Sequence, residues 1–279
     1  MGVVEDMNSY FATGGGLKES AKTVGTLGLA WAALELFSYL VLRPYFLRLL
    51  DGNPKLAGDT KGKAATATQM GPRVVCFVHN VLQVPLGLMV LTNAFFHSDR
   101  MFAADHFSSL VMAISAGYFL YDTVECIVRF EHEGPEFLLH GVFCFIVFTT
   151  LTHVRCMHWF GAGFLMWELS TPFVHFRWFL YKIGRDKSNV YAFNGAMGLL
   201  VFFLCRICWG PVVSLLFWKD SIAALSSPAG ASLPLPVVWF YRVCTVVMNG
   251  LNLYWFEKMV RIALDSSKKG GRKPAAKAA

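Results

Sequence analysis

The stretch Glu136-Phe-Leu-Leu-His140-Gly-Val-Phe-Cys-Phe-Ile-Val-Phe-Thr-Thr-Leu151 decides the class of this protein. It is an apolar run that contains one imidazole. An ionisable group at the centre of a membrane helix costs about 2.5–3.5 kcal/mol on insertion scales. Similar apolar stretches elsewhere also contain ionisable side chains, namely Asp122, Glu125, Glu168, His175, Arg177, Arg206 and Arg242. A membrane chain with this many ionisable groups is predicted to fold around an interior polar cavity.

The composition supports a membrane protein and not a soluble one. Of the 279 residues, 55% are hydrophobic and 15% are charged, and the mean hydropathy is +0.48. A soluble domain has roughly 25% charged residues. The net charge is +7, and much of it lies in the tail from Lys258 to Lys277. This basicity indicates membrane orientation and attraction to anionic lipid, and we expect no nucleic-acid partner.

Seven stretches predict membrane-spanning helices, each of which needs about 20 mostly apolar residues. They are residues 24–47, 73–96, 107–130, 136–153, 158–181, 191–218 and 236–262. With seven spans, the two termini lie on opposite sides of the membrane. Cations are sparse in the N-terminal segment and in the loops on its side, and dense in the other loops and the tail. The positive-inside rule therefore places the C-terminus in the cytosol and the N-terminus outside or in a lumen.

Polar side chains in the second and third segments raise two alternatives. Tyr118, Asp122 and Glu125 are spaced i, i+4 and i+7 and so share one helical face. This face is either a seam that pairs helices or a site for a substrate or a proton. His79, in the second segment, is either an interhelical hydrogen bonder or a functional group. Arg73 lies at the basic end of the same segment.

The segment 158–181 contains the densest polar motif, within residues 167–178. Glu168 and His175 are seven residues apart and are expected to share a face. Pro172 lies between them and is expected to kink the helix, which makes room for a ligand or water.

The last two segments contain Arg206 and Arg242, which are deep enough to need carboxylate partners. Asn249 and Asn252 follow on the final segment. His140 is the strongest single candidate for chemistry, because imidazole acts as a nucleophile or general base near neutral pH. The alternative for His140 is a structural hydrogen bond.

No metal ion or cofactor is predicted. Cys205 and Cys208 have CxxC spacing, but no second ligand pair accompanies them. His79, His140 and His175 offer haem ligands in principle, yet no histidine spacing repeats on two segments.

Several motifs, taken in order, resemble the TLC domain family, which includes the ceramide synthases. The resemblance covers about residues 70–265. It is carried by His140 and by four short motifs: Arg73-Val-Val-Cys-Phe-Val-His79, Gly117-Tyr118-Phe-Leu-Tyr121-Asp122, Glu168-Leu-Ser-Thr-Pro172-Phe and Leu251-Asn252-Leu-Tyr-Trp255-Phe256. It implies an all-α polytopic protein of about seven transmembrane helices, six of them in a barrel around a central polar cavity that handles lipid, usually in the endoplasmic reticulum.

The resemblance also divides the chain. Residues 1–23 are expected to be a non-cytosolic N-terminal segment, and residues 24–69 the first transmembrane helix and a cytosolic loop. Residues 70–265 are expected to be the TLC-like domain, and residues 266–279 a basic cytosolic tail.

The sequence departs from the ceramide synthases at two points. Those enzymes have a His-His pair where this chain has His140-Gly141, and an Asp pair further on that this chain lacks. The motif that begins at Glu168 looks like the branch of the family that does not make ceramide.

Three hypotheses on function follow. The first is a lipid-homeostasis protein that binds or senses a lipid or an acyl chain. The second is an acyltransferase that uses acyl-CoA as substrate, with His140 as the reactive group and Asp122 or Glu168 as its orienting carboxylate. The third is a structural subunit of a membrane assembly, and the oligomeric state is left open. The residues expected to contact lipid or line the cavity are Arg73, His79, Tyr118, Glu125, His175, Arg206, Arg242, Asn249 and Asn252.

Overall fold

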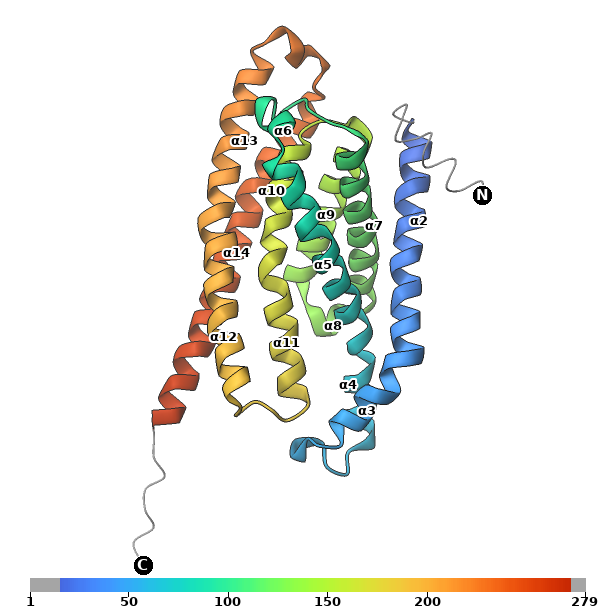
Figure 1. Cartoon of the computed structure of the whole chain (residues 1–279), viewed down its shortest axis with the longest axis vertical. Coiled ribbons are helices and arrows are strands. Elements are labelled where there is room, and N and C mark those ends of the chain that lie inside the picture. The colour runs from blue at the N-terminus through green and yellow to red at the C-terminus, as the bar shows by residue number, and fades with distance from the viewer. Residues whose placement is uncertain (1–15, 272–279) are drawn as a thin grey trace, which may run out of the picture.

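The computed structural model describes residues 16–271, which form a bundle of long helices that run roughly along one axis (Figure 1). These residues contain no strand. The longer helices are α2 (Leu17–Phe37), α3 (Arg43–Leu50), α4 (Thr60–Thr68), α5 (Met70–Thr92), α7 (His106–Val128), α9 (Pro135–Val154), α10 (His158–Leu165), α11 (Thr171–Lys182), α12 (Asn189–Phe202), α13 (Trp209–Leu225) and α14 (Leu235–Gly271).

Shorter segments connect or interrupt these helices. They are the helices α6 (Ala94–Ser98) and α8 (Phe130–Glu133), the 3-10 turns η2 (Pro54–Leu56), η3 (Met166–Ser170) and η5 (Pro228–Ser232), and the π-helical turns η1 (Ser38–Leu42) and η4 (Phe203–Cys208). Of the predicted N-terminal segment (1–23) and basic tail (266–279), residues 1–15 and 272–279 lie outside the described residues, whereas residues 17–23 belong to α2 and residues 266–271 to α14.

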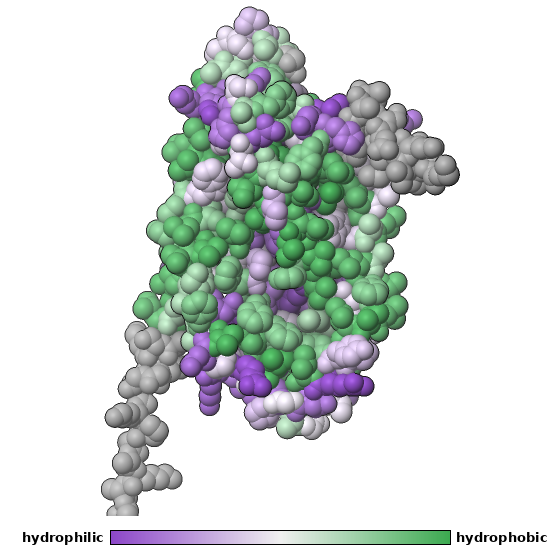
Figure 2. Space-filling model, in the orientation of Figure 1, coloured by the Kyte–Doolittle hydropathy of each residue, from purple (hydrophilic) through white to green (hydrophobic). Residues whose placement is uncertain are grey.

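Five helical stretches are long and apolar enough to cross a membrane, counted within the described residues. They are Leu17–Leu50, Thr60–Thr92, His106–Val128, Pro135–Val154 and Asn189–Leu225. The other two predicted spans are also helical, as α10–η3–α11 and as α14, but they do not meet that measure. On the face shown in Figure 2, apolar side chains form a broad band, and hydrophilic ones gather towards both ends. The predicted all-α polytopic class is confirmed.

Local sequence sets where several helices begin. Asp105 accepts a hydrogen bond from the Ser108 backbone N–H, and Ser108 accepts one from the backbone of Asp105, which forms a capping box at the start of α7. At the start of α9, Gly134 has a φ of +87°, and Pro135 takes the first helical position. The left-handed backbone at Gly134 favours glycine, and the fixed φ of proline suits a helix start.

Small residues allow the helices to approach closely. A Cβ on Gly117 of α7 would lie 2.5 Å from the Cβ of Leu27 of α2. A Cβ on Gly161 of α10 would lie 2.6 Å from Leu151 and Met112 side-chain atoms. Membrane helices associate largely through close packing of this kind, because lipid gives no hydrophobic drive between them.

The fifth predicted span is interrupted and not simply kinked. Pro172 has no N–H to bond the carbonyl of Glu168, and that carbonyl instead accepts a hydrogen bond from the N–H of Thr171. The chain forms the 3-10 turn η3 before Pro172 and resumes as α11. The predicted effect of Pro172 is therefore a change of helix type over residues 166–170.

Candidate functional site

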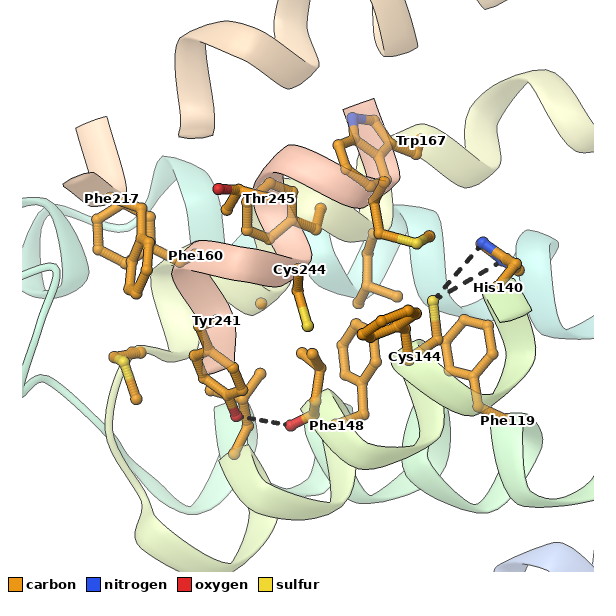
Figure 3. A pocket seen from close by; sticks show the side chains of 18 of the residues that line it. Phe119, His140, Cys144, Phe148, Phe160, Trp167, Phe217, Tyr241, Cys244 and Thr245 are labelled. Atoms are coloured by element: carbon orange, nitrogen blue, oxygen red, sulfur yellow. Dashed lines mark hydrogen bonds between the residues drawn. The ribbon is translucent and has the colours of Figure 1, made fainter. Parts of the chain in front are cut away.

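The bundle encloses an elongated cavity between α7, α9, α10, α13 and α14 (Figure 3). Its wall on α9 runs from His140 to Leu151 at helical spacing, a length of about 16 Å at the usual rise per residue. Its lining residues are Phe119, His140, Phe143, Cys144, Val147, Phe148, Leu151, Met157, Phe160, Gly161, Phe164, Leu165, Trp167, Glu168, Phe217, Tyr241, Cys244, Thr245 and Met248.

The cavity is apolar along most of its length, which corrects the expectation of a polar cavity. Phe160 and Phe217 lie at one end, and His140 lies at the other (Figure 3). Tyr241 lines the wall, but its hydroxyl is occupied because it donates a 2.8 Å hydrogen bond to the carbonyl of Val147. Among the lining residues, only Glu168 has a carboxylate and only His140 has an imidazole. The arrangement is that of an apolar tunnel with one polar end.

The polar end is built around an ion pair between two irregular helical turns. Glu168, on η3, has a carboxylate oxygen 3.3 Å from Nη2 of Arg206, on η4. Both residues are buried. Thr171 donates a 2.8 Å hydrogen bond to the other carboxylate oxygen and accepts one from Arg206. The predicted pairing of Arg206 with a carboxylate is confirmed.

The other two guanidinium nitrogens of Arg206 also donate hydrogen bonds. Nε donates to the carbonyl of Trp167 at 2.9 Å and to the hydroxyl of Ser170 at 3.1 Å. Nη1 donates to Oδ1 of Asn252 at 3.0 Å. The guanidinium also lies over the Trp255 ring, 5.7 Å from its centroid. A buried charge with this many partners is held in one position.

His140 lies beside this ion pair without belonging to it. Its Nε2 is 3.9 Å from Glu168, which exceeds hydrogen-bond distance. Its ring contacts Phe119 and Trp255 edge-on, and both ring nitrogens are 3.8 Å from the Cys144 sulfur. The imidazole therefore has only a weak thiol contact and faces the tunnel.

Asp122 lies on the other side of α9, next to Gly141. A Cβ on Gly141 would lie 3.2 Å from the Asp122 carboxylate and 3.2 Å from the Thr123 hydroxyl. The contact between α7 and α9 is the most extensive helix contact in the described structure. Packing therefore explains why Gly141 stands where the ceramide synthases have a second histidine, because a large side chain at this position would collide with α7.

Two predicted cavity residues lie instead in the core between α2, α5 and α7. The fully buried His79 ring stacks on Tyr118 with centroids 3.8 Å apart and meets Trp31 of α2 edge-on. His79 Nε2 is 3.4 Å from the Ser115 hydroxyl. Neither His79 nor Tyr118 is among the residues that line the tunnel. Their arrangement fits the predicted helix-pairing seam.

Two more predicted residues lie near the end of the bundle that holds α4 and α8. Glu125 accepts a 2.5 Å hydrogen bond from Arg129, whose guanidinium is also 3.1 Å from Glu35. Arg73 donates to the carbonyl of Gln69 at 2.7 Å. Of these contacts, the one between Arg129 and Glu35 joins the end of α7 to α2.

His175 lies on α11, seven residues after Glu168 on η3, and sequence spacing predicted that the two share a face. Its Nε2 is 3.1 Å from the Cys76 sulfur on α5. The spacing argument assumes a regular α-helix, and η3 alters the turn at Glu168.

Arg242 and Asn249 pair with α13 and not with carboxylates. Arg242 donates two hydrogen bonds to the Ser221 hydroxyl, at 2.9 and 3.2 Å. Asn249 lies seven residues after Arg242 on α14, and Ser214 lies seven residues before Ser221 on the antiparallel α13. Asn249 donates a hydrogen bond to the Ser214 hydroxyl. The prediction of a carboxylate partner for Arg242 is wrong, because the carboxylate beside Ser221, Asp220, binds Arg100 at 2.6 Å.

Sequence reasoning missed most of the tunnel wall. The signal was present on α9, where apolar residues recur from position 140 at intervals of three and four. That helix is apolar on every side, so the pattern alone does not separate the face toward the tunnel from the face toward lipid. In residues 16–271, no cluster of three or more His, Cys, Asp or Glu is placed to hold a metal ion.

Comparison with known proteins identifies the family. Residues 69–261 match the TLC domain. The chain is similar to Topoisomerase I damage affected protein 4 of Saccharomyces cerevisiae, with 37% identity over 60% of this chain and 60% of that protein. It is 30% identical to a TLC domain-containing protein of Schizosaccharomyces pombe, over 67% of this chain and 62% of that protein. It is also 26% identical to TLC domain-containing protein 4-B of Danio rerio, over 68% of this chain and 71% of that protein.

The alignment with the first of these relatives spans about 60% of that protein's length. The TLC domain match includes both turns of the ion pair, all of α9, and α14 as far as residue 261. The chain, a multi-pass membrane protein, belongs to the TLC domain family.

Proposed function

We propose that this protein acts in lipid homeostasis by binding one hydrocarbon chain of a lipid in the tunnel. The observation that carries the proposal is the shape and lining of the tunnel, which is long, apolar and polar at one end. A hydrocarbon chain would fill the part between His140 and Phe217, where aromatic and aliphatic side chains exclude water.

The polar end favours a neutral acceptor group on the bound lipid. The charges of Glu168 and Arg206 offset each other, and their hydrogen bonds are largely used within the protein. His140 is the group with spare capacity, since only a thiol contacts it closely. An ester, acyl or hydroxyl oxygen at the head of the chain would accept a hydrogen bond from the His140 imidazole.

Blocking the tunnel tests the proposal. Val147 lines the tunnel, whereas its neighbour Ile146 is 38% exposed on the outside of α9. Val147→Trp should abolish photo-crosslinking of the purified protein to a diazirine-bearing fatty acyl lipid, and Ile146→Trp should preserve it. Equal crosslinking in the two variants, both folded, would contradict binding in the tunnel.

An acyl-CoA-dependent acyltransferase is the second candidate, favoured by one observation, the position of His140 at the polar end of the tunnel. His140 and Glu168 are 3.9 Å apart, beyond hydrogen-bond distance, so Glu168 does not orient the imidazole in this structure. Labelled acyl-CoA separates the candidates. Label on the protein or on an acceptor, lost in His140→Ala, supports the enzyme, and its absence from a folded, lipid-binding protein supports binding alone.

We further propose residence in the endoplasmic reticulum with the end of α14 in the cytosol. Arg129 and Lys182 lie at the end of the bundle that holds α4, α8 and the α11–α12 loop, and α14 finishes at that end (Figure 1). Basic residues favour the cytosolic side. A tag at the C-terminus should be cleaved by protease added to sealed microsomes, and a protected tag would refute this orientation.

A further inference from the structure

Arg242 lies far from the Glu168–Arg206 ion pair, near the opposite end of the bundle. It is seven residues into α14, or about 10 Å from the start of that helix, which begins beside η5 (Figure 1). Each polar layer of a bilayer is about 5–8 Å thick. With the membrane surface at the start of α14, this depth places Arg242 at the border between lipid headgroups and hydrocarbon.

The Arg242 side chain has an uncompensated charge. The residue is only 5% exposed, and its hydrogen-bond partner is the neutral hydroxyl of Ser221. No carboxylate of the described chain lies within ion-pair distance, and the nearest in sequence to Ser221, Asp220, is bound to Arg100. Arg206, in contrast, has Glu168. A buried guanidinium without an anion is costly, so its retention needs an explanation.

Residues beside Arg242 on the outer face of α14 are exposed. Its guanidinium lies 4.8 Å from the Trp239 ring centroid and 5.2 Å from that of Trp218. Trp239 is 51% exposed, and the residues that follow on the same side, Val243 and Val246, are also exposed. Tryptophans are common at membrane interfaces. An anionic group could therefore reach Arg242 past Trp239, with apolar chains against the valines.

We propose that Arg242, between Trp218 and Trp239, binds the phosphate of a membrane phospholipid in the leaflet at the η5 end of the bundle. A guanidinium donates several hydrogen bonds in a fixed plane and suits phosphate oxygens better than an ammonium does. The phosphate supplies the missing negative charge, and the acyl chains of the same lipid cover the exposed valines. This site is separate from the tunnel.

Native mass spectrometry of the full-length protein in detergent tests the site. The ligands are phosphatidylcholine, the diacylglycerol with the same chains, and inorganic phosphate. Wild type should retain phosphatidylcholine in preference to diacylglycerol. Arg242→Gln should weaken that retention about tenfold or more, as expected for loss of a charge-assisted hydrogen bond. Arg261→Gln, an exposed arginine at the far end of α14 that pairs with Glu257, should leave retention unchanged.

A second variant keeps the test decisive if Arg242→Gln does not fold. Trp239→Leu removes a half-exposed ring and leaves the arginine in place, so it should fold and retain phosphatidylcholine more weakly than wild type. Equal retention of diacylglycerol and phosphatidylcholine by wild type would overturn the proposal, as would undiminished retention by a folded variant of Arg242. Inorganic phosphate that displaces no lipid supports the proposal, and phosphate that binds as well as the lipid overturns the assignment to a lipid.

Discussion

Replacing Glu168 with glutamine would leave the buried Arg206 guanidinium with no negative charge beside it. Glu168 and Arg206 are 6% and 5% exposed, and their charged atoms are 3.3 Å apart. Removing one partner of a buried ion pair costs about 3–5 kcal/mol. Glutamine keeps an acceptor for Thr171, and Arg206 keeps its bonds to Trp167, Ser170 and Asn252. We therefore expect a loss near the lower limit, about 3 kcal/mol.

Thermal unfolding in detergent measures this loss. A cost of about 3 kcal/mol corresponds to a fall in melting temperature of roughly 6–12 °C for a domain of this size. The matched control is Glu257→Gln, which breaks an exposed ion pair with Arg261 and should change stability by less than about 1 kcal/mol.

A double variant separates charge from packing. Glu168→Gln combined with Arg206→Met removes both charges, so it should be more stable than the sum of the two single changes predicts. If Glu168→Gln alone melts at the wild-type temperature, or if the two changes add exactly as independent sites do, the reasoning about an uncompensated charge is refuted.

Three further predictions follow from other contacts. Gly141→Ala places a Cβ 3.2 Å from two oxygens of α7 and should destabilise the fold by about 1–3 kcal/mol. Gly250→Ala is the control, because no atom lies within 4 Å of the added Cβ, and it should leave stability unchanged. Equal melting temperatures of the two variants would contradict this prediction. Outside the membrane, the hydrogen bond from Lys55 lowers the pKa of Asp186 below its ordinary value of 3.8. The ionised Asp186 therefore stabilises the fold above pH 3.8, and this contribution is lost as the pH falls through the lowered pKa. The stability difference between wild type and Asp186→Asn should therefore be seen at pH 7 and vanish in strong acid, and a difference that persists there would exclude this cause. His140→Leu should preserve crosslinking of a plain hydrocarbon probe in the tunnel and weaken that of an acyl ester, and equal loss of both would contradict a role in binding the head of the lipid.

The sequence predicted the helices well, because apolar stretches of sufficient length have few other stable conformations in lipid. It also predicted that Arg206 needs a carboxylate, since the cost of an unpaired charge does not depend on fold details. The same argument was wrong for Arg242, because a hydroxyl and two aromatic rings surround that guanidinium. Which partner an arginine meets depends on how α13 and α14 pack, and no local pattern encodes that.

The candidate site could be predicted only in part. His140 and Glu168 were named from their apolar surroundings, and both line the tunnel. The 3-10 turn at residues 166–170, which changes the angle between successive side chains between Glu168 and His175, was not predicted. Asp122 was grouped with His140 by the acid–base logic of catalysis, whereas it contacts the position of Gly141.

The π-helical turn η4 also sets the phase between two halves of one long helix. A π turn contains one residue more than an α turn, and α12, η4 and α13 follow one another without a break. Each residue of an α-helix advances the side-chain direction by about 100°. Deleting one residue between Phe203 and Cys208 would restore regular winding and rotate α13 by that angle relative to α12. Arg206 could then no longer contact η3 while Ser214 and Ser221 contact α14. The number of residues in η4 is therefore constrained as strictly as the identity of Arg206.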